Sequence, residues 1–167
     1  MGGSFERDAK YYDYPTSHAA VLYGNAKLSV SPYNGVNTTF RGFPRGITVF
    51  TSTGTDISVE QALFREGGIG IEVLQTPLKW DLQGTTFIGN SIAAVSSGAV
   101  NTLDCRDNYW GHPSGPNHAS NPFGLGDPVI GDVLFVPYAA TGLVTITSVG
   151  DHPAGQVPNA FTATGDI

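Results

Sequence analysis

Four related segments decide the fold of this chain: YNGVNTTF (Tyr33–Phe40), ISVEQALF (Ile57–Phe64), WDLQGTTF (Trp80–Phe87) and LDCRDNYW (Leu103–Trp110). They begin 24, 23 and 23 residues apart, and their closing aromatic residues keep the same spacing. A fixed period of about 20–50 residues is typical of solenoid proteins, in which each repeat packs only on its neighbours. The repeat therefore predicts an architecture more firmly than it predicts a chemistry.

Equivalent positions of the four segments form columns that alternate in polarity, as the period of two in a strand requires. The second and fourth columns are mainly polar and are expected to face solvent. The first, third and eighth columns are mainly apolar and are expected to face inward. The first inward column holds Tyr33, Ile57, Trp80 and Leu103, and the eighth holds Phe40, Phe64, Phe87 and Trp110.

A second strand follows each of the first three segments, after a turn rich in Gly or Pro. These strands are expected in GITVF (Gly46–Phe50), GIGIEVL (Gly68–Leu74) and SIAAVS (Ser91–Ser96). Equivalent strands that stack once per repeat form parallel sheets, and crossovers between parallel strands are normally right-handed. The sequence thus predicts an all-β, right-handed, single-stranded parallel β-helix of about four coils with a C-terminal lid.

The flanking segments predict three regions. Residues 1–30 are expected to form an N-terminal cap or flanking segment, in which Leu28 to Val30 is a candidate start of the first coil. Residues 31–138 hold the β-helix and its closing coil. Residues 139–167 contain one strand-like run, LVTITSV (Leu143–Val149), and are expected to form a tail or a linker to a further domain.

Composition excludes some classes of function. The 167 residues carry a net charge of −6, so the chain lacks the basic surface that nucleic acids and anionic membranes attract. No apolar run is long enough to predict a membrane-spanning helix. The single cysteine, Cys105, shares its column with Val59 and Leu82 and is therefore expected to be a buried apolar residue.

The segment from Asn101 to Tyr138 resembles the closing coil of right-handed parallel β-helix proteins of the pectate-lyase-like superfamily. The resemblance rests on NTLDCRDNYWGHPSGPN and NPFGLGDPVIGDVLFVPY, and with the four repeats it covers roughly residues 31–138. It implies the fold and structural roles for Asn108, Trp110, Gly111 and Pro116. It does not select an activity, because such segments close lyases, epimerases and surface proteins alike.

One constellation on the outer face supports a sharper hypothesis. The second column stacks Asp81 on Asp104, and the fourth places Glu60 and Arg106 nearby. In a parallel ladder the two aspartates would be about 5 Å apart, a spacing that shifts a carboxyl pKa or attracts a cation such as Ca²⁺. These four residues are therefore candidate substrate-binding residues, and Asp81 and Asp104 are candidate Ca²⁺ ligands. The resemblance to pectate lyases implies that Arg106 would be the catalytic base.

Simpler explanations compete with this hypothesis. The acidic columns are also what a solvated face with a screening arginine would show. His112, His118 and Asp107 form a possible metal or acid–base cluster, but their spacing matches no common ligand pattern, and solvated turn residues are the preferred explanation.

The leading functional expectation is a non-catalytic β-helix module of a larger extracellular or cell-surface protein, acting as a stalk or as a carbohydrate-contacting surface. It requires no cofactor and has glycans and further domains of the same polypeptide as partners. The first alternative is a Ca²⁺-dependent polysaccharide lyase or a related uronate-acting enzyme. The second is a self-associating structural solenoid, because a short solenoid exposes strand edges at its ends.

Overall fold

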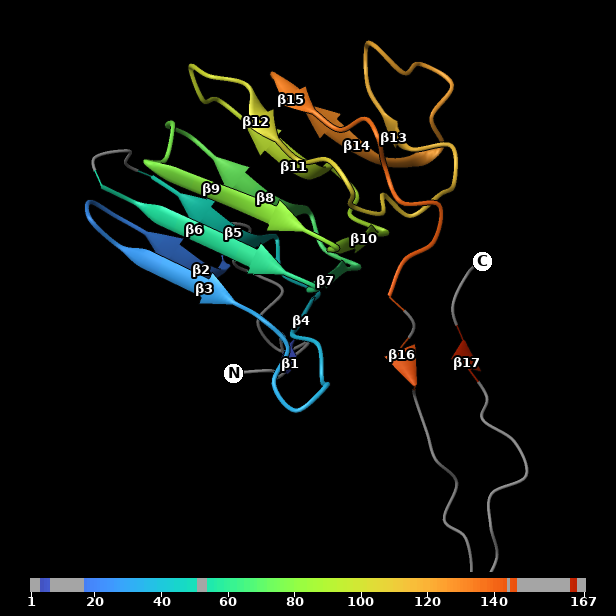
Figure 1. The fold of residues 1–167 in the computed structure, drawn as a ribbon, viewed down its shortest axis with the longest axis horizontal. Helices are drawn as coiled ribbons and strands as arrows, with labels where there is room; N and C mark the ends of the chain where they lie inside the picture. Colours follow the sequence, from blue (N-terminus) through green and yellow to red (C-terminus); the bar gives the residue numbers. More distant parts are fainter. Residues whose placement is uncertain (1–3, 7–16, 51–53, 144, 147–162, 165–167) are drawn as a thin grey trace, which may run out of the picture.

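The computed structural model describes residues 4–6, 17–50, 54–143, 145–146 and 163–164. In these ranges the chain forms strands and turns and no helix, so they hold no helix that is long and apolar enough to cross a membrane. Figure 1 shows the strands stacked in chain order, from β2 and β3 at one end to β14 and β15 at the other. The all-β prediction is confirmed for this part of the chain.

Most strands belong to three groups of parallel strands. The first sheet has the order β1 (Ser4–Glu6), β4 (Thr39–Arg41), β7 (Leu63–Arg65), β10 (Thr86–Ile88). The second sheet has the order β13 (Pro116–Asn117), β14 (Gly126–Ile130), β11 (Ala93–Ser97), β8 (Ile69–Val73), β5 (Arg45–Val49), β2 (His18–Leu22). The third sheet has the order β3 (Lys27–Val30), β6 (Asp56–Glu60), β9 (Lys79–Gln83), and β12 (Leu103–Asp104) pairs separately with β15 (Val133–Leu134).

Apart from β13 and β14, neighbours in these sheets are every third strand along the chain, for example β4, β7 and β10. The chain therefore passes through all three sheets before it returns to the first, an arrangement compatible with a parallel β-helix. The strands predicted from GITVF, GIGIEVL and SIAAVS are confirmed as β5, β8 and β11, with bounds that differ by one or two residues. Outside this stack, β16 (Thr145–Ile146) and β17 (Ala163–Thr164) form an antiparallel pair. Most of the predicted strand-like tail lies outside the described residues.

An aromatic stack runs through the core along the eighth column. Phe40, Phe64 and Phe87 are in register in the first sheet. The ring centroids of successive members are 4.5 Å apart for Phe40 and Phe64, 5.2 Å for Phe64 and Phe87, and 5.2 Å for Phe87 and Trp110. All four side chains are buried, so the inward position predicted for this column is confirmed.

The second sheet leaves room for these rings by placing glycine opposite them. A Cβ atom on Gly70 would lie 2.9 Å from Cδ1 of Phe87 and 2.6 Å from the carbonyl oxygen of Ala94. Gly46 would meet Phe64 in the same way. Glycine at these two positions therefore complements the aromatic column, because a larger side chain in place of either glycine would overfill the core.

The first of the four segments does not begin like the others, which corrects the predicted register. Tyr33 and Val36 face each other across a tight turn and are both 58% exposed, so Tyr33 does not belong to the inward column. The inward strand of this repeat is β3, in which Leu28 pairs with Ile57. The candidate start at Leu28 to Val30 is thus confirmed as a strand, and residues 31–38 form a longer turn than in later repeats.

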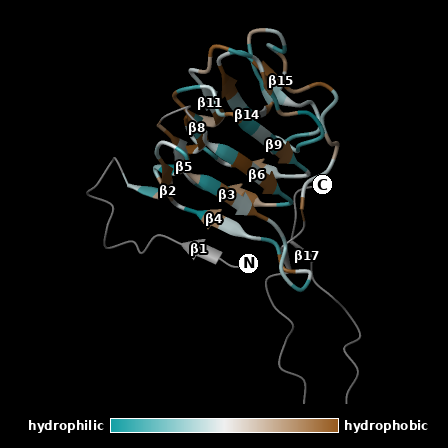
Figure 2. Cartoon of the chain, turned by 60° about the vertical axis from the view of Figure 1, so that its left-hand side comes forward, coloured by the Kyte–Doolittle hydropathy of each residue, from teal (hydrophilic) through white to brown (hydrophobic). Residues whose placement is uncertain are grey.

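The ends of the stack also differ from a simple cap and lid. Strands β2 and β3, within the segment expected to flank the solenoid, continue the second and third sheets. At the other end, β14 extends the second sheet and β15 pairs with β12, so part of the predicted lid adds strands to the stack. Figure 2 shows hydrophobic and hydrophilic residues following one another along the stacked strands, as expected for elements with one buried face.

Candidate functional site

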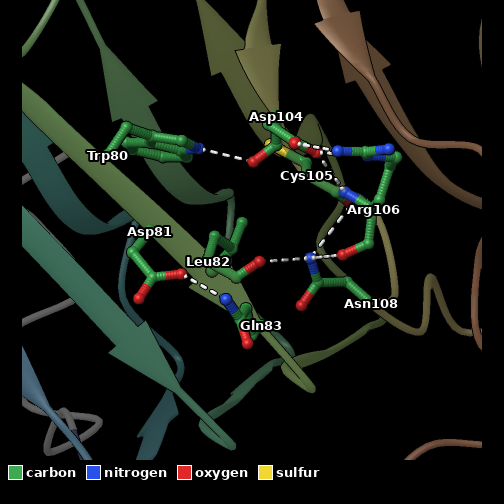
Figure 3. A network of polar contacts seen from close by, with 8 residues as sticks. All are labelled: Trp80, Asp81, Leu82, Gln83, Asp104, Cys105, Arg106 and Asn108. Carbon is green, nitrogen blue, oxygen red and sulfur yellow. Dashed lines mark hydrogen bonds and ion pairs between the residues drawn. The ribbon is translucent and has the colours of Figure 1, made fainter.

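The candidate site lies on the outer face of the third sheet and its continuation in β12. In β9 and β6, Asp81 is in register with Ser58, and Gln83 with Glu60. Asp104 is the second residue of β12, and Arg106 follows it in the turn. Gln83, Asp104 and Arg106 are exposed and Asp81 is half-buried, and Figure 3 shows these four residues from close by.

Asp104 and Arg106 form a two-point ion pair with each other. Nε of Arg106 donates to Oδ1 of Asp104 at 2.9 Å, and Nη2 donates to Oδ2 at 2.6 Å. The hydrogen bonds from Arg106 lower the pKa of Asp104, and those to Asp104 raise the pKa of Arg106. The pair therefore stabilises the charged form of both groups. A guanidinium held in this way is a poor candidate for a catalytic base, which must first lose its proton.

Asp81 has a different partner. Nε2 of Gln83 donates to Oδ1 of Asp81 at 2.8 Å, and Figure 3 shows the Asp81 carboxylate turned toward Gln83 while that of Asp104 is turned toward Arg106. Among the described residues, no group of three or more His, Cys, Asp or Glu side chains is placed to hold a metal ion. A Ca²⁺ site at Asp81 and Asp104 stays a prediction.

The two aspartates are not neighbours in a backbone ladder, and the Trp80 side chain bridges their strands instead. The sheet pairings join β9 to β6 and β12 to β15 but do not join β9 to β12. Nε1 of the Trp80 indole instead donates to the main-chain oxygen of Asp104 at 2.8 Å. The indole is half-buried and packs against the core outside the aromatic stack, so Trp80 faces inward as predicted but is not fully buried. Its side chain substitutes for part of the backbone ladder between the two strands.

Asn108 organises the corner below this face. Its side chain is fully buried, and its Nδ2 donates to the main-chain oxygens of Leu82, Cys105 and Arg106 at 2.9, 3.0 and 2.9 Å. Its Oδ1 accepts the main-chain N–H of Thr85 at 2.8 Å. Buried polar groups need partners, and this one amide contacts four main-chain groups of two successive repeats, with its two N–H groups shared among three oxygens. The structural role implied for Asn108 is therefore clear in the structure.

In the closing segment, Gly111, Gly126 and Asp127 each lie close to the backbone of neighbouring segments. Gly111 has a φ of 86°, and a Cβ atom on Gly126 would overlap the main-chain oxygen of Trp110. Asp127 accepts hydrogen bonds from the main-chain N–H groups of Gly89 and Asn90 at 2.9 and 2.8 Å, and from the Asn90 side chain at 2.7 Å. Burial raises the pKa of Asp127, and these donors oppose that change. The sequence does not predict this anchoring role of Asp127, because the role depends on a turn in the preceding repeat.

Other sequence candidates have structural explanations. Pro116, for which the resemblance implies a structural role, lies in β13, at the sheet edge where proline is tolerated. His112 and His118 each pair through Nδ1 with the serine two residues later, at 2.8 Å in both cases. Cys105 is buried as predicted, and burial raises the pKa of its thiol.

Comparisons with protein-family models, with curated proteins and with solved structures found no match to this chain. The resemblance to the pectate-lyase-like superfamily consequently rests on the residues that carry it.

Proposed function

We propose that the three sheets wind into a right-handed, single-stranded parallel β-helix of about four coils, and that this solenoid is a non-catalytic module of a larger extracellular or cell-surface protein. Its role is that of a stalk or of a surface that contacts carbohydrate. The observation that carries the proposal is the mutual pairing of polar groups on the outer face. Asp104 pairs with Arg106 and Asp81 with Gln83, which favours a binding or structural surface over a catalytic centre.

The surface offered to a glycan is the outer face of the third sheet. Ser29, Ser58 and Asp81 are in register in β3, β6 and β9, and Glu60 is in register with Gln83. Hydroxyl, carboxylate and amide groups thus recur at the spacing of parallel strands, about 4.8 Å. Such a row suits a linear polymer whose hydroxyl groups also recur regularly. The net charge of −6 favours neutral glycans over polyanionic ones.

The binding hypothesis is tested by titrating the full chain with neutral and acidic polysaccharides in isothermal calorimetry. We expect saturable binding that weakens at least tenfold in the double variant Asp81→Ala/Gln83→Ala and persists in Tyr33→Ala, a matched change on an exposed turn. Binding that is unaffected by the double variant would remove this face from consideration. The stalk role alone would remain if no polysaccharide bound.

The alternative is a Ca²⁺-dependent polysaccharide lyase or a related uronate-acting enzyme. It is favoured by the presence of two carboxylates and one arginine on the same outer face (Figure 3). This function predicts Ca²⁺-dependent release of unsaturated uronate products, followed by ultraviolet absorbance, and loss of that release in Arg106→Lys and Asp104→Asn with the fold retained. A flat absorbance trace across acidic polysaccharides, with and without Ca²⁺, would dismiss it.

A further inference from the structure

Strand β2 is an edge strand of the second sheet, and it comes first along the chain among the strands of that sheet. It pairs with β5, with His18 opposite Arg45, Ala20 opposite Ile47 and Leu22 opposite Val49. Ile47 and Val49 of β5 are fully buried. An edge strand of this kind protects the next strand from solvent and from pairing with other chains.

A chain of polar contacts links β2 to its neighbour β5 and to β8, the next strand of the sheet. Nδ1 of His18 lies 2.8 Å from Oγ1 of Thr48 in β5, and Oγ1 of Thr48 lies 3.4 Å from Oε2 of Glu72 in β8. Nε of Arg45 donates to the same Glu72 oxygen at 2.7 Å. Thr48 is fully buried, and the side chains of Arg45 and Glu72 are 30% and 14% exposed, so water screens this cluster only partly.

The electrostatic balance of the cluster opposes a second positive charge. Among the described residues, Arg45 and Glu72 are the charged groups that act on His18, from β5 and β8. Burial and the positive charge of Arg45 lower the pKa of His18, and the negative charge of Glu72 only partly offsets them. Glu72 is already engaged by Arg45, which limits the compensation that it offers to a protonated imidazole.

We propose that β2 is an acid-released edge strand, in which protonation of His18 weakens the pairing of β2 with β5. The unfolded or detached strand takes up a proton more readily than the docked strand does. The docked form therefore has its full stability above the ordinary histidine pKa of about 6.5, and this stability declines as the pH falls toward the lower value of the docked form. Acid exposes the edge of β5 first, because local opening at a sheet edge costs less than global unfolding.

The experiment is amide hydrogen exchange on the full chain at pH 7.5 and pH 5, corrected for the pH dependence of the chemical exchange rate. In the wild type we expect peptides from β2 and from the facing edge of β5 to lose protection at pH 5, while β8 and β11 keep theirs. In His18→Gln, which carries no titratable group, the β2 and β5 peptides should show equal protection at both pH values. The matched control His118→Gln, in the closing segment, should retain the acid-dependent loss.

Equal protection of wild-type β2 at both pH values would overturn the proposal, and so would a loss that persists in His18→Gln. If that variant does not fold, NMR titration of the His18 ring in the wild type decides instead. A midpoint lower in the native chain than in urea-unfolded chain supports the switch, and an equal or higher midpoint refutes it.

Discussion

The aromatic stack allows the most direct test of how the repeats hold together. Phe87 is fully buried, and its ring lies 5.2 Å from the rings of both Phe64 and Trp110. Replacing a buried phenylalanine by alanine costs about 3–5 kcal/mol, and the loss of two ring contacts places Phe87→Ala in the upper part of that range. With a urea m-value of about 2 kcal/mol per molar, the unfolding midpoint should fall by about 2 M.

The measurement is urea unfolding followed by far-ultraviolet circular dichroism. Tyr33→Ala is the matched control, because Tyr33 is an aromatic residue of a related segment that is 58% exposed. Its free energy of unfolding should remain within about 0.5 kcal/mol of the wild type. Phe87→Ala must therefore differ clearly from the same type of change at an exposed aromatic residue of a related segment.

A double-mutant cycle with Gly70 tests the packing geometry itself. Gly70→Ala places a Cβ atom 2.9 Å from Cδ1 of Phe87, and such overpacking costs about 1–3 kcal/mol. In the Phe87→Ala background the ring contact is gone and only the contact with the Ala94 oxygen remains, so the same change should cost less. We expect a coupling energy of about 1 kcal/mol. The reasoning would be refuted if the destabilisations by Gly70→Ala and Phe87→Ala were additive, or if Phe87→Ala alone destabilised the protein by less than about 1 kcal/mol.

Three further substitutions test the corners and surface pairs by the same unfolding measurement. Asn108→Ala should lower the free energy of unfolding by about 3 kcal/mol or more, because it leaves buried main-chain groups without partners. Asn101→Ala, at an exposed turn, should be neutral. Equal effects would contradict the structural role of the Asn108 hydrogen bonds. Gly84 has a φ of 56°, so Gly84→Ala should lower the free energy of unfolding by about 1–2 kcal/mol. Gly98 has no positive φ, so Gly98→Ala should lower it by less. The reverse order would be inconsistent with a left-handed backbone at Gly84. Glu66 combines a φ of 55° with ion pairs to two arginines, so Glu66→Ala should destabilise more than Glu66→Gly, which loses the same pairs but removes the backbone strain. Hydrogen bonds from Arg41 and then Arg65 lower the pKa of Glu66, so the stability from these pairs is present above the ordinary carboxyl pKa and is lost as the pH falls through the folded value. Because the groups are exposed, the free energy of unfolding that the wild type loses between pH 7 and pH 3 should exceed the loss in Glu66→Gln by less than about 1 kcal/mol.

The corner residues show how much of the site a single sequence can predict. Gln61, Gly84 and Asp107 occupy the same position in successive repeats and all have a positive φ, of 48°, 56° and 60°. Only one of the three is glycine, so composition did not mark this column as a turn. The polar rows of the outer face were predictable because strand periodicity alone determines which side chains point outward. The partners of Asp104 and Asp81 were not, since side-chain pairing depends on rotamers that no periodicity specifies.

The sequence by itself determined the period, the inward aromatic column and the all-β class, because stacked repeats must place equivalent apolar residues at equivalent positions. Only the tertiary structure decided where the first repeat begins, since Tyr33 fits the pattern of its column yet lies in an exposed turn while Leu28 of β3 takes the inward place. It also decided that a Trp80 side-chain hydrogen bond links β9 to β12 where no backbone pairing does, and that Gly70 makes room for Phe87. These outcomes depend on contacts between residues far apart along the chain, where volume and hydrogen bonding select one arrangement among several that the local pattern allows.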